Sequence, residues 1–142
     1  MHKRIYKRKD GEELLLFGSK LHTGVSTKEL KATPTSKPHL RWNPSRQEWV
    51  TYSAGRKDRT AFPSKEYCPL CPSGVLNFPT EIPFKNFEIA VFPNRWSSFN
   101  THDEVIKINN IKKINSDGHC EVIVYTSKHQ DTIVDMPIER II

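Results

Sequence analysis

The sequence has no long apolar run. Hydrophobic residues make up 36% of its 142 positions, and the mean hydropathy is -0.61. The longest apolar stretches, residues 14–17 and 122–125, fall far short of the ~18–20 apolar residues that a membrane-spanning helix needs. No apolar segment follows the basic N-terminus, so it does not match a secretory signal. These absences exclude a membrane-spanning or exported protein, and we expect a cytoplasmic one.

Cysteine and net charge are also limited. Three cysteines, an odd number in a chain without an export signal, argue against a disulfide framework. The net charge of +6 comes mainly from five basic residues within the first nine positions. We interpret this basic arm as a solvated tail, and because the rest of the chain is close to neutral, composition alone does not predict a nucleic-acid binder.

The chain divides into a basic arm with a linker, residues 1–37, and a domain over residues 38–142. The linker is rich in Ser, Thr, Lys and Pro, which is typical of loops. The Asn43-Pro44 pair predicts a turn, and the aromatic and β-branched residues that follow predict a strand at residues 48–52. Apolar character predicts further strands at residues 87–92, 105–108 and 121–125. The last of these is nearly continuous, as in strands that are buried on both faces.

The C-terminal residues, 135–142, match the beginning of a helix. Asp135 is suited to cap it and Pro137 to occupy its first turn. Three isoleucines that follow are spaced to face one core, namely Ile138, Ile141 and Ile142. Because helices shorter than ~12–15 residues are marginal in water, we expect the sequence to be truncated within a helix.

A C-x-x-C motif, Cys68 to Cys71, is the most informative local pattern. It lies in an irregular segment, residues 61–86, that holds five of the ten prolines and needs a further constraint to stay ordered. Two thiolates on one knuckle suit tetrahedral zinc. A redox pair would open a helix, which Pro72 disfavours, and incidental thiols are the third interpretation. The spacing does not choose between the further ligands available, which are His102, His119, Cys120 and His129.

A series of motifs resembles the galactose-1-phosphate uridylyltransferase family. In chain order they are Arg41-Trp42-Asn43-Pro44, Glu48-Trp49-Val50, Arg56 and Arg59, Cys68-Pro69-Leu70-Cys71-Pro72, Val91-Phe92-Pro93-Asn94-Arg95, residues 118–125, and Ser127-Lys128-His129. The resemblance covers the N-terminal half of the family's length. It implies an α+β fold, with the antiparallel β-sheet of a histidine-triad-like half-domain, a zinc knuckle loop, and truncation at the start of a helix.

The resemblance also implies a reaction. The family transfers UMP between UDP-glucose and galactose 1-phosphate through a uridylyl-histidine, in galactose metabolism. The nucleophile is the second histidine of a His-Pro-His segment in the other half of the family's chain, and this sequence contains no His-x-His. We therefore expect these residues to be inactive alone and to be completed by a C-terminal half or a homodimer partner. A related ADP-sugar nucleotidyltransferase has similar motifs, so uracil and adenine both stay open as the base.

The family's zinc ligands correspond to Cys68, Cys71 and His129. A fourth ligand is a histidine just upstream of the family's nucleophile, and it has no counterpart in this sequence. Three ligands are thus expected here, with the fourth supplied by water or by another histidine.

The family's nucleotide contacts correspond to two arginines and the end of a strand. Arg56 and Arg59 match arginines that lie against the nucleotide's phosphates, where forked guanidinium donors suit phosphoryl oxygens. Asn94 matches an asparagine that contacts the ribose. Arg95 stands where the family often has an acidic residue, so the chain departs from the pattern at that edge of the pocket.

An alternative is a free-standing zinc-knuckle module that binds nucleic acid through its basic arm. Proteins that bind single strands place aromatic platforms beside their positive charge. The arginines at positions 56 and 59 have no such aromatic run beside them, which makes nucleic acid the weaker interpretation of the partner.

Overall fold

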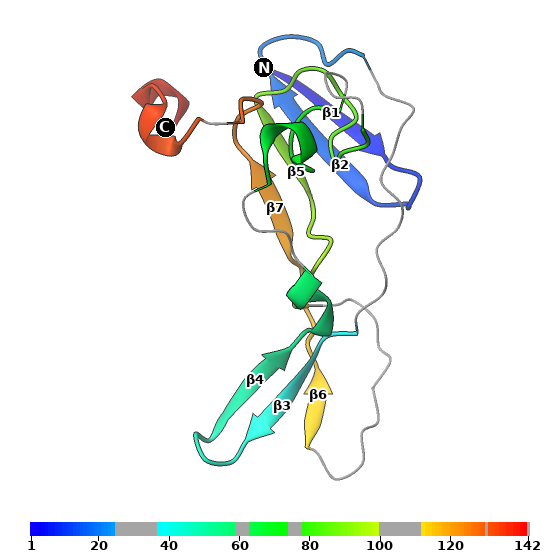
Figure 1. The fold of residues 1–142 in the computed structure, drawn as a ribbon, viewed down its shortest axis with the longest axis vertical. Helices are drawn as coiled ribbons and strands as arrows, with labels where there is room; N and C mark the ends of the chain where they lie inside the picture. The colour runs from blue at the N-terminus through cyan, green and yellow to red at the C-terminus, as the bar shows by residue number, and fades with distance from the viewer. Residues whose placement is uncertain (25–36, 59–62, 74–77, 100–111, 130, 142) are drawn as a thin grey trace. The chain divides into compact units, whose positions relative to one another are not determined.

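The computed structural model describes residues 1–24, 37–58, 63–73, 78–99, 112–129 and 131–141 (Figure 1). These residues form antiparallel strands and short 3-10 turns, and no α-helix occurs among them. The predicted antiparallel β-rich architecture is therefore confirmed, whereas the helical part of an α+β fold has no counterpart in the described ranges. None of the described residues belongs to a helix with the length and apolar character needed to cross a membrane.

Contacts within the chain define two units. The first contains residues 1–31, 62–92 and 123–142, and the second contains residues 32–61 and 93–122. A four-stranded sheet has the order β1-β2-β5-β7, from strands His2–Lys7, Glu13–Gly18, Ile89–Pro93 and Glu121–Val124. A three-stranded sheet in the second unit has the order β4-β3-β6, from strands Glu48–Tyr52, His39–Asn43 and Lys113–Asn115.

The core of the first unit follows the alternation of β2. Leu14 and Leu16 are fully buried, while the alternate residues Leu15 and Phe17 are half-buried. This is the period-two pattern of a strand with one face on a core. Leu16 lies opposite Ala90 of β5. Phe84 is also fully buried, with its ring centroid 5.2 Å from that of Tyr6 in β1. Burying each of these large side chains contributes roughly 1.5–3 kcal/mol to stability.

The interpretation of the N-terminal arm as a solvated tail is wrong. Residues 2–7 form β1, which pairs with β2 in an antiparallel hairpin. The side chain of Arg8 is 11% exposed and pairs with Glu81 at 2.7 Å, and the guanidinium of Arg4 lies 4.8 Å from the ring centroid of Phe84. Long basic side chains can cover apolar surface with their stems. A basic composition is therefore compatible with a strand at residues 2–7.

Three of the four predicted strands occur close to their expected positions. They are β4, β5 and β7, and the segment 105–108 lies outside the described residues. The predicted burial of the last strand on both faces is wrong, since the side chain of Ile123 in β7 is 63% exposed. β7 is the final strand in its sheet's order, and an edge strand has a neighbour on one side alone.

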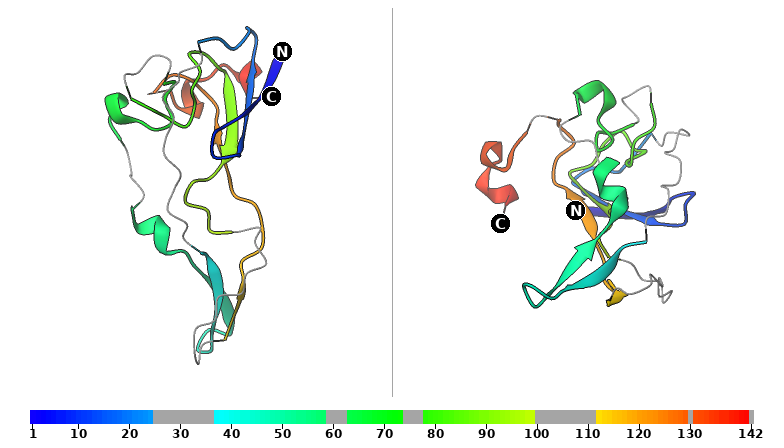
Figure 2. Two further views of the ribbon diagram at one scale, coloured as in Figure 1. Left: turned by 90° about the vertical axis from the view of Figure 1, so that its right-hand side faces the viewer. Right: turned by 60° about the horizontal axis from the view of Figure 1, so that its bottom comes forward.

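In the second unit, β3 and β4 form a hairpin that Figure 2 shows as two adjacent arrows joined by a tight turn. Trp42 lies opposite Trp49 across it, with their ring centroids 5.5 Å apart. The Asn43 side chain accepts hydrogen bonds from the backbone N–H groups of Ser45 and Arg46, which is the Asx-turn chemistry that an Asn-Pro pair favours.

The 3-10 turns are η1 (Ala54–Asp58), η2 (Lys65–Tyr67), η3 (Ile133–Asp135) and η4 (Ile138–Arg140). The prediction that Asp135 caps a helix is wrong. Thr132 is the N-cap of η3, and its backbone N–H and hydroxyl both donate to the Asp135 carboxylate. Ile138 and Ile141 are 59% and 50% exposed, so they do not face a core among the described residues, and Ile142 lies outside them.

Candidate metal centre

The two knuckle cysteines lie in a turn that directly follows η2. The backbone N–H of Cys71 donates to the carbonyl of Cys68, which closes the turn. The N–H of Glu81 donates to the carbonyl of Pro69 at 2.8 Å, and that of Ser73 donates to Ile82 at 3.0 Å. These two hydrogen bonds attach the knuckle to residues 81 and 82, which are buried. Both cysteines of the knuckle are buried as well.

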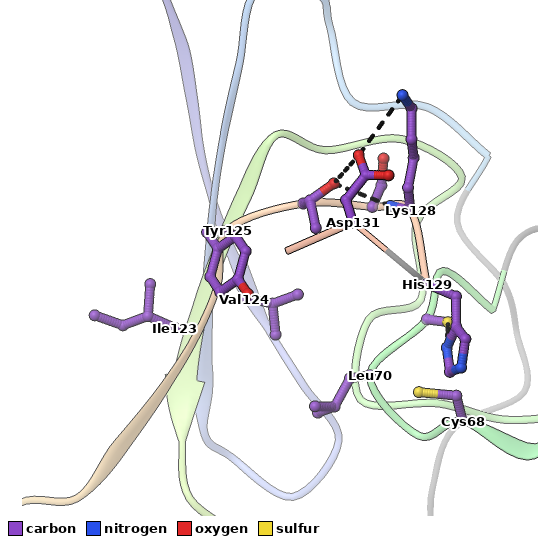
Figure 3. A pocket seen from close by; sticks show the side chains of 11 residues that line it. Cys68, Leu70, Ile123, Val124, Tyr125, Lys128, His129 and Asp131 are labelled. Carbon is purple, nitrogen blue, oxygen red and sulfur yellow. Dashed lines mark hydrogen bonds and ion pairs between the residues drawn. The ribbon is translucent and has the colours of Figure 1, made fainter. Parts of the chain in front are cut away.

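His129 reaches the knuckle from the turn after β7. The hydroxyl of Thr126 accepts a hydrogen bond from the N–H of Lys128, and Lys128 forms an ion pair with Asp131. The imidazole Nδ1 of His129 lies 3.3 Å from the sulfur of Cys71. Ligand atoms of Cys68, Cys71 and His129 all lie within 4.8 Å of one another. Figure 3 shows the imidazole of His129 beside the side chain of Cys68.

The chemistry of this donor set fits a divalent metal ion. Burial raises the pKa of the Cys71 thiol to about 11, the neighbouring Cys68 adds to the rise, and the charge of Lys65 opposes it. A bound cation reverses this preference because it stabilises the thiolate that coordinates it. Two sulfurs and one imidazole nitrogen are three of the four ligands of a tetrahedral Cys/His zinc site.

The other expected metal ligands do not join this group. His119 and Cys120 belong to the second unit and to no potential metal-binding group among the described residues, and His102 lies outside the described ranges. Sequence spacing alone left all of these open, so the selection of His129 rested on the family resemblance.

An open pocket adjoins the three ligand residues. Figure 3 shows Leu70 and Tyr125 beside it, with Lys128 and Asp131 at its polar edge. Leu70 lies between the two knuckle cysteines in the chain, and β7 contributes the apolar side chain of Val124. No sequence pattern predicted this pocket, because its apolar lining comes from segments far apart in the chain.

In the second unit, the predicted nucleotide-binding residues lie on two loops that contact each other. Arg56 of η1 is exposed and donates to the hydroxyl of Ser98 at 2.6 Å, and Ser53 donates to the carbonyl of Ser97 at 3.1 Å. No sequence pattern predicted these contacts with Ser97 and Ser98. Arg59 lies outside the described residues.

The side chain of Asn94 organises its own loop. Its Oδ1 accepts the backbone N–H of Trp96 at 2.9 Å, and its backbone N–H donates to the carbonyl of Cys120 at 2.7 Å. The side-chain amide also lies 3.5 Å from the Cys120 sulfur. Arg95, which follows it, is half-buried and has its own interaction partner.

Comparison with known proteins identifies the family. Residues 28–142 match the family model described as "Galactose-1-phosphate uridyl transferase, N-terminal domain". The chain belongs to this family. The resemblance inferred from the sequence motifs is thereby confirmed.

Two curated relatives carry the name galactose-1-phosphate uridylyltransferase. The chain is 35% identical to the Thermotoga maritima protein over 105 residues, which covers 72% of this chain and 31% of that protein. It is 26% identical to the Streptomyces lividans protein over 143 residues, covering 99% of this chain and 35% of that protein. The chain therefore spans about a third of the length of these relatives. No solved structure matches it significantly.

Proposed function

We propose that this chain forms the zinc-binding and nucleotide-binding N-terminal part of a UDP-glucose–hexose-1-phosphate uridylyltransferase. The observation that carries the proposal is the convergence of Cys71 and His129, 58 positions apart in a chain of this family. The names of the two relatives support a transferase of galactose 1-phosphate.

In this proposal, zinc is held by Cys68, Cys71 and His129, and a residue beyond these described segments supplies the fourth ligand. The ion cross-links the proline-rich knuckle to the chain after β7, which would make the knuckle part of a histidine-triad-like fold. Its contribution is to folding, because closed Cys/His sites stabilise small loops that have little core of their own.

The nucleotide part of the proposal rests on the second unit. Arg56 and Arg59 bind phosphate oxygens and stabilise the charge that develops on the transferred phosphoryl group. Asn94, followed by Arg95, lies against the ribose. In the complete reaction, a histidine nitrogen attacks the α-phosphorus of UDP-glucose and glucose 1-phosphate leaves, after which galactose 1-phosphate takes up the uridylyl group.

The attacking histidine belongs to a His-Pro-His segment that the 142 residues do not contain. We therefore expect these residues alone to bind the nucleotide sugar without turning it over. A separate C-terminal segment or a second copy would complete the site. Two features favour this proposal over the nucleic-acid-binding alternative: the basic arm is a paired strand, β1, and its Arg8 is paired with Glu81.

The test measures UDP-glucose binding by calorimetry and compares Arg56→Gln with Arg46→Gln. Both variants lose one positive charge, but Arg46 lies in the β3–β4 turn, is 72% exposed and pairs with Glu48. We expect Arg56→Gln to weaken binding about tenfold, the cost of one charge-assisted contact, and Arg46→Gln to leave it unchanged. Equal weakening in both would contradict the assignment, and tighter binding of ADP-glucose than of UDP-glucose would assign adenine as the base.

A further inference from the structure

One face of the three-stranded sheet in the second unit gathers basic side chains. Side chains directly opposite each other in antiparallel strands, and those two positions apart in one strand, share a face. In this register His39 lies opposite Tyr52, and Arg41 lies opposite Lys113. These four residues define the Arg41 face.

The Arg41 guanidinium is held in place on this face. Its Nε donates to Nε2 of His39 at 2.8 Å, and its central carbon lies 4.1 Å from the ring centroid of Tyr52. Nδ1 of His39 lies 3.3 Å from the carbonyl of Lys37. With Nε2 accepting from Arg41, these two contacts of the ring orient the arginine. The two terminal nitrogens of Arg41 have no hydrogen-bond partner among the described residues.

Lys113 adds a second positive charge directly across from Arg41. Its Nζ is shielded from solvent and has no hydrogen-bond partner within the described part of the chain. Like charges opposite each other destabilise a sheet, and desolvation together with the charge of Arg41 lowers the pKa of Lys113. Glu48 lies on the same face, two positions from Val50, which lies opposite Arg41, and it is paired with Arg46 at 3.0 Å. No carboxylate of the described residues pairs with either cation.

We propose that Arg41 and Lys113 form a binding site for a phosphate dianion. The planar guanidinium offers two parallel donors to two phosphate oxygens, and the shielded ammonium attracts the anion as a nearby point charge without contacting it. A dianion neutralises both cations, whereas a single carboxylate leaves one positive charge unbalanced. Because Tyr52 and His39 already fix Arg41, little side-chain entropy is lost when the anion binds. The proposal does not depend on the roles assigned to Arg56 and Asn94.

Inorganic phosphate is the probe for this site. The 142-residue chain, labelled with nitrogen-15, is titrated at low ionic strength, and the Arg41 Nε–H and Lys113 amide signals are followed by NMR. We expect saturable shifts at both residues, with a Kd in the millimolar range or tighter. Arg41→Lys keeps the charge but loses the fork, so it should weaken binding at least tenfold, and Lys113→Gln should weaken it at least fivefold.

Lys112→Gln is the matched control. Lys112 is the neighbour of Lys113 but lies 5.3 Å and 5.6 Å from the ring centroids of Trp42 and Trp49, which belong to the alternate positions of the hairpin. The Lys112→Gln variant should bind phosphate with the same affinity as the unchanged chain. Equal weakening by Lys112→Gln and Lys113→Gln, or the same shifts with chloride at equal ionic strength, would overturn the proposal because they indicate general charge attraction.

A second measurement is independent of binding. In phosphate-free buffer, Lys113→Gln should raise Tm because it removes the repulsion from Arg41, and added phosphate should raise Tm of the unchanged chain but not of the variant. A lower Tm for the variant without phosphate would contradict the argument. Titrations with glucose 1-phosphate and UMP distinguish the source of the anion: equal affinities mean that the phosphate alone is recognised, and a tighter nucleotide or sugar phosphate identifies the larger ligand that carries it.

Discussion

Replacing Glu81 with glutamine should strongly destabilise the first unit. The Glu81 side chain is 5% exposed and its Oε2 lies 2.7 Å from Nη1 of Arg8, whose side chain is 11% exposed. Removing one partner of a buried ion pair costs about 3–5 kcal/mol because the remaining charge stays buried. Arg8 keeps a contact of 3.3 Å to Asp10, which is more exposed, so we expect a loss near 3 kcal/mol, about the lower end of that range.

The magnitude is large against a total stability of about 5–15 kcal/mol for a domain. It is measured by urea unfolding, as the change in midpoint at constant slope. Glu48→Gln is the control, because the Arg46–Glu48 pair is 72% and 43% exposed and such pairs contribute about 0–1 kcal/mol.

A double variant, Arg8→Met with Glu81→Met, separates the burial of charge from the loss of packing. Replacing both ions with apolar side chains of similar size should recover most of the stability. Equal losses for Glu81→Gln and Glu48→Gln would refute the reasoning, since they would mean that Arg8 and the N-terminal hairpin do not belong to the core.

Three further predictions concern the first unit. Leu16→Ala should cost about 2–5 kcal/mol in the same urea assay, because Leu16 is fully buried in β2; a loss below about 1 kcal/mol would contradict its place in the core. The Ser19 hydroxyl and N–H donate to the Glu88 carboxylate and lower its pKa. These hydrogen bonds therefore stabilise the folded chain fully at pH values above the unfolded pKa of Glu88, and their contribution is lost as pH falls through the lower folded pKa. Ser19→Ala should therefore be less stable by about 1 kcal/mol at pH 7. This difference should disappear at pH values low enough to protonate Glu88 in the folded chain. A difference in stability that does not vary with pH would contradict this. Because the pKa of Cys71 is raised to about 11, zinc binding to the metal-free chain near pH 7 should release protons, measured by calorimetry in buffers of different ionisation enthalpy; a binding heat independent of the buffer would contradict thiolate coordination.

The sequence alone predicted the elements whose local signals agree with their environment. β4 was predicted from its aromatic and β-branched residues, and the turn before it from Asn43 and Pro44. The cysteine spacing predicted a zinc knuckle, and the structure places Cys68 and Cys71 with His129 in one potential metal-binding group, while zinc itself stays a prediction. His129 was selected through the family resemblance, because nothing local relates a histidine after β7 to a loop 58 positions earlier.

The remaining features depend on tertiary pairing that spacing does not reveal. β1 carries basic residues that usually indicate a solvated segment, but it pairs with β2. The guanidinium groups of Arg4 and Arg8 lie near the rings of Phe84 and Phe92. β7 has the composition of a buried strand but lies at an edge of its sheet. Arg41 lies directly opposite Lys113 because of the register between β3 and β6, and no local sequence pattern encodes that register.

The most direct test of the proposed function is the zinc content of the freshly purified chain. We expect about one zinc ion per chain by elemental analysis, lost in the Cys68→Ser, Cys71→Ser double variant and in His129→Gln. Cys120→Ser and His119→Gln, which change the other described candidates, should retain the metal. A folded chain without zinc, or loss of the metal in Cys120→Ser as well, would contradict the account.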